Sequence, residues 1–281
     1  MNRKITVSAD CICDLGEEIL SKSEIPTIYF HVKTDSGDFK DMQEITSENI
    51  IEYISEGGSE CSSQAPSAEE FSEFFEKNRR RDSVLIHICA GKEMSLSYRN
   101  ACEAAGKTDN VMVFDSGQIS SGLGLIVMKA ARLAESGMDA EDIIAELEVF
   151  KKKVSTTFIT YNADYLYRGG KVGIFFKNLC SDLHIHPIIG VENGKLRNKG
   201  IIIGRYDHSC RNYIRSRLRG KKYQKEVLFI TYAGFSKKQI DSILAEIKKR
   251  VNFGNIYVTK ASATITANSG PETLGLQYVK K

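Results

Sequence analysis

The chain has 281 residues, of which 42% are hydrophobic and 27% charged, and its formal net charge is +3. This balance is that of an ordinary globular protein, and it argues against binding of nucleic acid or membrane by the surface as a whole. No apolar stretch approaches the roughly 20 residues of a membrane span, and the first residues lack the apolar core of a signal peptide. The 7 cysteines include no C-x-x-C pair, which argues against a zinc site or a disulfide framework. We therefore expect a soluble, cytoplasmic protein with reduced thiols.

Strands and helices alternate regularly over about the first 155 residues. Apolar and β-branched runs predict strands at 5–7, 27–33, 83–89 and 111–114. Helices are predicted at 14–20, 47–55, 96–105, 120–136 and 139–154, and another follows the capping box Ser67–Glu70. This alternation predicts right-handed βαβ units in a mostly parallel sheet, and so an α/β domain over residues 1–155.

The second half has a different pattern. We predict a short helix at 164–170, strands at 183–190 and 200–206 around a hairpin turn at Glu192–Gly194, and further strands at 227–231 and 256–260. A second capping box, Ser236–Gln239, opens an amphipathic helix between the last two strands. Hairpin pairing mixed with helices indicates an α+β domain over residues 156–281, with a mixed or antiparallel sheet.

Hydroxyl-rich loops follow three predicted strands of the first domain, and a fourth precedes the capped helix. These loops are residues 8–11, 95–98, 115–122 and 62–67. In an open α/β sheet, ligands bind beyond the carboxyl ends of the strands, so we expect the four loops on one rim. Hydroxyls and helix amino termini supply hydrogen-bond donors without a full charge, which suits a carboxylate head group. Serine is also common at caps and turns, and each single serine is open to that plainer interpretation.

No catalytic constellation or cofactor motif is visible in the sequence. There is no G-x-S-x-G elbow, no G-x-x-x-x-G-K-[ST] loop and no G-x-G-x-x-G after a strand. His184 and His186 share one strand face, but no third metal ligand accompanies them. Gly122 and Gly124 fall inside a predicted helix, where close packing explains them better than phosphate binding. The residues therefore predict no metal, triad or nucleotide chemistry.

Residues 197–225 form a basic segment. It holds 10 Lys or Arg and a single acid, Asp207, so it carries about +9 in a chain whose net charge is +3. Such a segment can dock an acidic partner, phosphates or an anionic membrane surface, and it can equally be a solvated helix face. Nucleic acid is not expected as a partner, because few aromatic residues accompany these cations.

At the hydroxyl-rich loops the chain resembles the DegV family, and the resemblance runs from residue 4 to residue 278. Seven family motifs occur in order. They are Ala9–Leu15 for T-D-S-x-x-D-L, Ser63–Ser67 for T-S-Q-P-S, Met94–Ala101 for L-S-G-T-Y-x-x-A, Asp115–Gly124 for D-S-x-x-x-S-x-G-x-G, Tyr165–Val172 for Y-L-x-x-G-G-R-[IV], Ile185–Ile189 for I-K-P-I-[IL], and Asn268–Gly275 for H-T-G-P-G-x-x-G.

The resemblance implies two domains with a ligand tunnel between them that holds one long-chain fatty acid. It also implies a binding subunit, not an enzyme, that presents the fatty-acid carboxylate to a separate ATP-dependent fatty acid kinase subunit for phospholipid synthesis. The family's carboxylate-binding positions correspond to Ser63, Ser95 and Asn268 here, and Ser97 is a further candidate. No cofactor is implied, and we expect a monomer.

The resemblance also assigns residues around the head group and a surface for the partner. Leu96, Ser116 and Glu272 are expected beside the carboxylate, and Lys171 and Arg205 are candidate contacts with the kinase subunit.

Four residues depart from the family pattern. Asn268 replaces a histidine, so it can donate a hydrogen bond but carries no charge. Leu96 replaces a glycine and narrows the head-group site, whereas Lys171 replaces an arginine and lacks its bidentate fork. Glu272 replaces a glycine near the head group, where it would repel a carboxylate. These departures leave open a lipid-binding paralogue without a kinase partner, and a regulatory protein that uses the basic segment.

Overall fold

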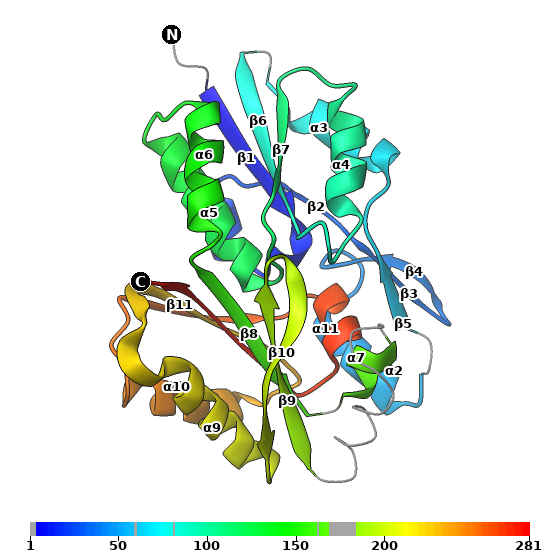
Figure 1. Ribbon diagram of the computed structural model, residues 1–281. Coiled ribbons are helices and arrows are strands. Elements are labelled where there is room, and N and C mark those ends of the chain that lie inside the picture. The colour runs from blue at the N-terminus through cyan, green and yellow to red at the C-terminus, as the bar shows by residue number, and fades with distance from the viewer. Residues whose placement is uncertain (1–3, 59–60, 81, 162, 169–183) are drawn as a thin grey trace.

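The computed structural model of the chain describes residues 4–58, 61–80, 82–161, 163–168 and 184–281. Their strands form three sheets: a four-stranded parallel sheet, a six-stranded mixed sheet and a three-stranded antiparallel sheet. Figure 1 shows the first two sheets in the upper and lower halves of the molecule, with the smallest sheet at one side between them. The α/β class, with a parallel first sheet and a mixed second sheet, is thereby confirmed.

The parallel sheet has the strand order β2-β1-β6-β7 and is covered by helices on both faces. On β6, Leu85 and Cys89 pack against α3 and α4, whereas Ile86 and Ile88 pack against α5 and α6 on the other side (Figure 1). This two-sided burial explains why the strand is a continuous apolar run. The elements are β1 (Lys4–Asp10), η1 (Cys11–Cys13), α1 (Glu17–Lys22), β2 (Thr27–Ile28), α3 (Ala68–Asn78), β6 (Ser83–Cys89), α4 (Ser97–Ala105), β7 (Val111–Asp115), α5 (Ser121–Glu135) and α6 (Ala140–Phe150).

The six-stranded sheet has the order β10-β9-β8-β13-β11-β12, in which β11 and β12 are the parallel pair. Helices α9 and α10 cover one of its faces. Asn193 and Gly194 both have positive φ and close the predicted β9–β10 hairpin. The elements are β8 (Val154–Thr160), β9 (Ile185–Glu192), β10 (Lys195–Ile203), α9 (Tyr206–Leu218), η2 (Arg219–Lys221), β11 (Tyr223–Ala233), α10 (Lys237–Lys248), β12 (Asn255–Lys260) and β13 (Thr273–Lys280).

The smallest sheet packs against a helix from near the end of the sequence. It contains β3 (His31–Thr34), β4 (Gly37–Lys40) and β5 (Cys61–Gln64), and α2 (Ser47–Ser55) lies close by. Helix α11 (Ala263–Ser269), from near the end of the sequence, packs against α2 and β5, and α7 (Asp164–Arg168) adjoins α11. The chain changes from the parallel to the mixed sheet between β7 and β8, and the predicted domain boundary at 155/156 stays a prediction.

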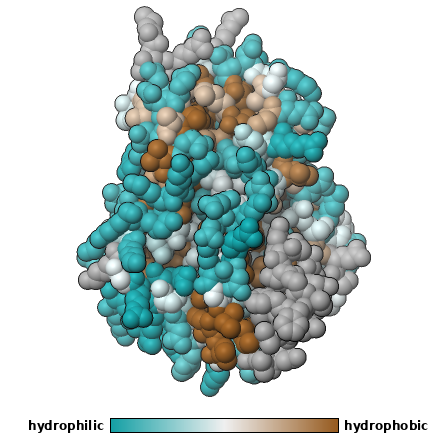
Figure 2. Space-filling model, viewed as in Figure 1, coloured by the Kyte–Doolittle hydropathy of each residue, from teal (hydrophilic) through white to brown (hydrophobic). Residues whose placement is uncertain are grey.

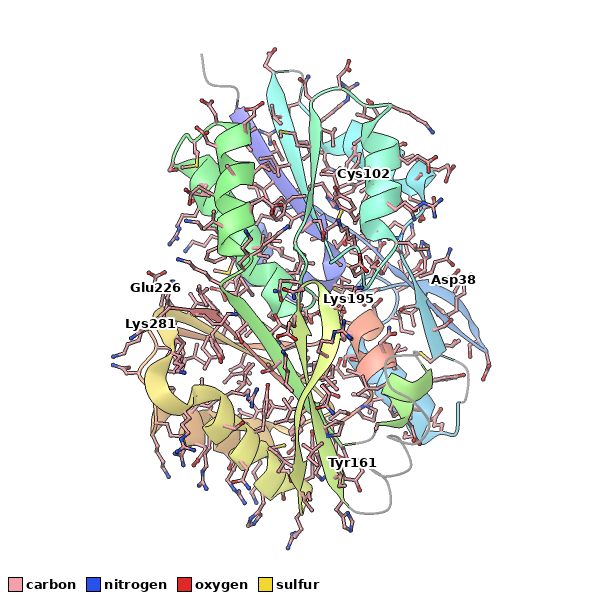
Figure 3. All side chains as sticks on the ribbon, in the orientation of Figure 1. Asp38, Cys102, Tyr161, Lys195, Glu226 and Lys281 are labelled. Carbon is pink, nitrogen blue, oxygen red and sulfur yellow. The ribbon has the colours of Figure 1, made fainter. Side chains whose placement is uncertain are left out.

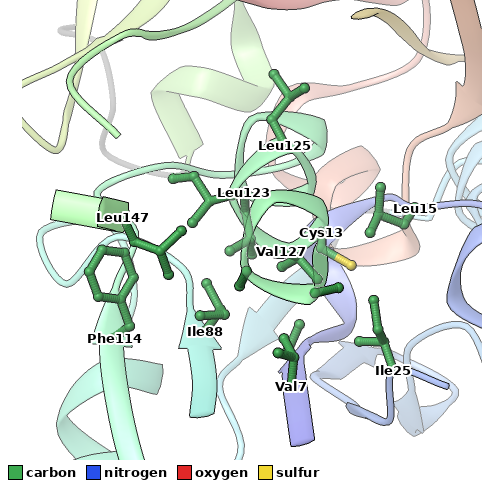
Figure 4. Close-up of a cluster of buried hydrophobic side chains, with 14 of the residues drawn as sticks. Val7, Cys13, Leu15, Ile25, Ile88, Phe114, Leu123, Leu125, Val127 and Leu147 are labelled. Atoms are coloured by element: carbon green, nitrogen blue, oxygen red, sulfur yellow. The ribbon is translucent and has the colours of Figure 1, made fainter. Parts of the chain in front are cut away.

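The two large sheets share one core. Val154, Phe229 and Val279 of the mixed sheet belong to the same buried cluster as the residues around α5. Figure 4 shows part of this cluster, with Leu123, Leu125 and Val127 on α5. A Cβ on Gly122 would meet the Thr156 hydroxyl of β8, and one on Gly124 would lie 2.6 Å from the Cys13 carbonyl oxygen. The prediction that these two glycines serve close packing is confirmed.

The β9–β10 hairpin also reaches the parallel sheet. Lys195 Nζ, at the hairpin tip, lies 3.2 Å from Glu93 Oε2 in the loop after β6. Figure 3 shows Lys195 near the middle of the molecule, where the two halves meet.

Several elements differ from the sequence prediction. The single strand predicted at 27–33 is divided, with β2 in the parallel sheet and β3 in the smallest sheet. The helix predicted at 139–154 ends at Phe150, because the chain enters β8 at Val154. Within the described ranges, strands β4, β5, β8 and β13 and the α-helices α9 and α11 were not predicted. Strand β13 lacked the expected signal because Thr273, Gly275 and Gln277 occupy one face, and β8 lacked it because Ser155, Thr156 and Thr157 interrupt its apolar residues.

The visible surface is mostly hydrophilic. Figure 2 shows one brown patch low on this face, in the region where β10 ends in Figure 1, and β10 exposes Ile201 and Ile203. Among the residues that the structure describes, no helix has both the length and the apolar character needed to cross a bilayer.

Candidate ligand-binding site

A cavity of about 310 Å³ lies between the loops of the parallel sheet and one face of the mixed sheet. Its third wall is formed by β5 and α11. The apolar part of the lining consists of Ile12, Phe30, Ala65, Met94, Leu96, Ile119, Phe158, Leu166, Leu196, Tyr232, Ala261 and Ile265. Two larger surface hollows, of about 460 Å³ beside α5 and about 610 Å³ beside the β9–β10 hairpin, are lined by many charged side chains. The apolar cavity is therefore the best candidate for a small organic ligand.

Ser63 and Asn268 meet in this cavity although 205 positions separate them. Asn268 Nδ2 donates to Ser63 Oγ at 2.8 Å and to the Thr264 carbonyl oxygen at 2.8 Å. Both amide hydrogens of Asn268 are thus used within the protein. Ser63 accepts one of them, so its own hydroxyl proton is available to a ligand.

Ser95 occupies the same cavity on the loop between β6 and α4. Its Oγ accepts a hydrogen bond of 3.1 Å from the backbone N–H of Ser97. This bond fixes the Ser95 oxygen and leaves its proton to point elsewhere, as at Ser63. Leu96 also lines the cavity and is 62% exposed, so this end of the cavity is its mouth.

The cavity lining is uncharged over the described part of the chain: no Asp, Glu, Lys, Arg or His side chain contributes to it. A carboxylate bound there would depend on neutral hydroxyl donors and on the amino-terminal end of α4, which begins directly after Leu96. The Ser63 and Ser95 hydroxyls are therefore donors that this end of the cavity can offer to an anion.

The wall formed by the mixed sheet carries a row of polar side chains that sequence reasoning missed. Thr156, Thr231, Thr273 and Gln277 line the cavity from three strands, and each is at most 6% exposed. On β13 the alternate residues Leu274, Leu276 and Tyr278 point to the opposite face and pack with α9 and α10. The alternation of threonine or glutamine with large apolar residues was the available signal.

Three predicted head-group residues lie outside the lining. Ser97 is fully buried, and its hydroxyl donates to Asp10 Oδ1 at 2.8 Å, because its position on the first turn of α4 directs it toward β1. The Ser116 hydroxyl accepts from the backbone N–H of Gln118 at 3.0 Å. Glu272 contributes its backbone carbonyl, which accepts from Tyr161 N–H and the Tyr206 hydroxyl, and burial raises the pKa of its carboxyl group.

Of the two candidate contacts with a kinase subunit, only Arg205 is described, and it does not line the cavity. Arg205 is an exposed residue at the start of α9, and Lys171 lies outside the described residues. The basic segment is divided among β10, α9, η2 and β11, and Arg215 forms an ion pair with Glu246 at 3.3 Å. Its proposed docking role stays a prediction.

Two buried carboxylates hold the helix that carries Asn268. Asp14 Oδ1 accepts from Ser262 N–H at 2.9 Å, and the two oxygens of Asp41 accept from Ala263 N–H at 2.8 Å and Thr264 N–H at 2.9 Å. These bonds satisfy the first backbone donors of α11. Burial raises the pKa of Asp14 to about 7, and it also raises the pKa of Asp41.

Ser8, His87 and Asp10 form a hydrogen-bonded chain that resembles a catalytic triad in its order. Ser8 Oγ lies 2.9 Å from His87 Nδ1, and His87 Nε2 lies 3.2 Å from Asp10 Oδ1. All three are fully buried, and His87 is packed among Phe71, Phe74 and Phe75. Cys89 lies close to Asp10 and His87, so a thiol, a carboxylate and an imidazole, each of which can bind a metal, are near one another. Because these side chains are fully buried and do not line the cavity, the cluster lies outside the candidate site.

The chain was also compared with known proteins. A model of the family described as "Uncharacterised protein, DegV family" matches residues 4–281. The chain belongs to the DegV family. A DegV domain-containing protein of Clostridium perfringens is 25% identical over 292 residues, covering 99% of each chain.

Solved DegV-family structures share this fold. One, described as "Fatty Acid Binding of a DegV family Protein from Thermus thermophilus", has a TM-score of 0.89 at 22% identity and covers 100% of both chains. Another DegV protein, from Eubacterium eligens and described as loaded with heptadecanoic acid, has a TM-score of 0.85 at 19% identity and covers 99% of this chain and 100% of its own.

Proposed function

We propose that this chain binds a long-chain fatty acid in the cavity, with the carboxylate hydrogen-bonded by Ser63 and Ser95 at the mouth. The observation that carries the proposal is the coincidence, in one uncharged cavity, of an apolar lining with two serine hydroxyls whose protons are available to a ligand. Fatty acids are named for two DegV-family structures of the same fold, which supports this ligand class.

The physical requirements of a fatty acid match these walls. Each buried CH₂ group contributes roughly 0.8 kcal/mol, so a long acyl chain is retained by an apolar slot without any charge. A carboxylate that leaves water needs hydrogen-bond donors to offset its lost hydration. In this proposal Ser63 and Ser95 donate directly, and Asn268 acts through Ser63, whose oxygen it holds.

We further propose that the bound carboxylate is presented to a separate ATP-dependent fatty acid kinase subunit. A cavity mouth beside the exposed Leu96 would leave the head group accessible to such a partner. Arg205 and Lys171 remain the candidate contacts. The alternative is a lipid-binding protein without a kinase partner, and the two differ in whether acyl phosphate forms when kinase subunit, ATP and loaded protein are mixed.

A binding titration tests the primary proposal. Delipidated protein is mixed with radiolabelled octadecanoic acid, and bound ligand is separated by rapid gel filtration. We expect saturable binding of one fatty acid per chain. Absence of saturable binding, with circular dichroism showing a folded protein, would contradict the proposal.

A further inference from the structure

Gln277 is a buried amide on the cavity wall with unused hydrogen-bonding capacity. It is 2% exposed, and its Oε1 accepts a hydrogen bond of 3.2 Å from the Thr231 hydroxyl. No residue within the described ranges accepts a hydrogen bond from its Nε2. Its Nε2 is not one of the fully enclosed polar atoms that lack a partner in the described part of the chain, so it is open to the cavity and can be paired by a ligand.

The chain makes room for this amide. Residues 273, 275 and 277 lie on the same face of β13, and a Cβ placed on Gly275 would lie 2.6 Å from Gln277 Nε2. Gly275 lines the cavity, and its lack of a side chain leaves open the space in which the end of the Gln277 side chain lies. Gly275 thus allows the amide to lie along the cavity wall.

The polar neighbours hold the amide in one orientation. Thr231 contacts Ser121 Oγ at 2.6 Å and Thr259 Oγ1 at 3.2 Å in addition to Gln277. Thr156, directly across from Gln277 in the sheet, donates to Gln118 Oε1 at 2.7 Å. With Oε1 engaged by this network, Nε2 is the atom that the amide presents to a ligand.

Along β13 the amide lies at the other end of the cavity-facing residues from Thr273. Thr273, four residues earlier on the same strand, bonds to the Ser269 carbonyl at 3.0 Å, next to Asn268. Four residues of strand span roughly 13 Å. A fatty acid whose carboxylate is held at Ser63, beside Asn268, would therefore meet Gln277 with its chain rather than with its carboxylate.

We propose that the acyl ligand carries an oxygen-bearing group along its chain, a hydroxyl or a carbonyl, which accepts a hydrogen bond from Gln277 Nε2. This inference rests on the proposed fatty-acid function and names its substrate class. An unsubstituted chain leaves the amide unpaired, whereas an oxygenated chain satisfies it. Sites built to hydrogen-bond a substrate group discriminate strongly against the analogue that lacks the group.

The test compares octadecanoic acid with octadecanoic acids hydroxylated at successive mid-chain positions, using delipidated wild-type protein and the variants Gln277→Leu and Gln277→Met. We expect the wild type to bind at least one hydroxylated acid roughly tenfold more tightly than octadecanoic acid. In both variants the ratio of the two affinities should fall to about one, and circular dichroism checks that the variants are folded.

Two results would overturn the inference while leaving fatty-acid binding intact. One is equal or weaker binding of every hydroxylated acid by the wild type. The other is a hydroxyl preference that survives in both variants. If the wild type binds none of the acids, the proposed function fails as well, so the two failures are distinguishable.

Discussion

Asn268 Nδ2 donates to Ser63 Oγ at 2.8 Å and so joins α11, near the end of the chain, to β5. The second hydrogen of the same nitrogen goes to the Thr264 carbonyl oxygen. Asn268 therefore has no donor left for a carboxylate, and its contribution to the head-group site is to position the Ser63 hydroxyl. Three predictions for the site and its supporting contacts and one for the packing of the two sheets follow from the described geometry.

Removing either serine hydroxyl should weaken fatty-acid binding. A hydrogen bond to a charged group contributes about 1.5–3 kcal/mol, so Ser63→Ala and Ser95→Ala should each raise Kd roughly tenfold or more. Ser55→Ala, at an exposed position on α2, is the matched control and should leave Kd unchanged. Wild-type affinity in both cavity variants would remove the serines from the site.

Substitutions of Asn268 should separate positioning from charge. Asn268→Ala frees the Ser63 hydroxyl to rotate, and the rise in Kd should be smaller than for Ser63→Ala. Asn268→Asp places a second carboxylate in an uncharged lining, and it should weaken binding further through repulsion. Titrations of radiolabelled fatty acid measure both. An equal rise in Kd for Asn268→Ala and Asn268→Asp would show that a charge at this position does not affect the bound ligand.

The buried Asp14 should make stability depend on pH. Its pKa is raised from 3.8 to about 7 by burial, so the folded protein binds a proton that the unfolded chain has released. The contribution of Asp14 to the free energy of unfolding is therefore largest at low pH. It falls by up to roughly 1 kcal/mol per pH unit as the pH rises toward 7, and it is constant at higher pH.

Asp14→Asn removes this titration while keeping an oxygen for Ser262 N–H and tolerating the positive φ of the position. Urea unfolding at about pH 5.5, 6.5, 7.5 and 8.5 measures the difference in free energy between wild type and variant. That difference should shift against the wild type as pH rises to 7. A difference independent of pH would contradict the assignment.

The contact between α5 and β8 should make Gly122 intolerant of a side chain. Alanine normally favours a helix over glycine by about 1 kcal/mol, yet a Cβ here meets the Thr156 hydroxyl. Gly122→Ala should therefore destabilise by about 1–3 kcal/mol in denaturant unfolding. Gly106→Ala, where the nearest atom is 3.5 Å away and φ is −62°, is the control and should be neutral or stabilising. Similar changes in the free energy of unfolding for Gly122→Ala and Gly106→Ala would show that the two sheets tolerate a wider separation.

Local signals predicted much of the fold. The capping boxes at Ser67 and Ser236 open α3 and α10 as expected, and the apolar run at 83–89 is the buried strand β6. These elements are specified by short-range chemistry. Strands β8 and β13 were missed because polar or small residues line the cavity from both, Thr156 on β8 and Thr273, Gly275 and Gln277 on β13, and the selection of these residues depends on contacts distant in the sequence.

Short sequence motifs predicted part of the candidate site as well. Ser63, Ser95, Leu96 and Asn268 come together in one cavity, as their motifs indicated. Ser97 follows two residues after Ser95, yet the start of α4 directs it to Asp10 instead. Gln277 has no motif at all, and its significance appears when the space above Gly275 and the bond from Thr231 are known.

The most direct measurement of the central claim is native mass spectrometry of the protein purified from bacterial cells. The account predicts a wild-type mass exceeding the chain by that of one fatty acid, and loss of this adduct in the Ser63→Ala/Ser95→Ala double variant. A wild-type spectrum with the ligand-free chain alone, from preparations that also bind no added fatty acid, would contradict it.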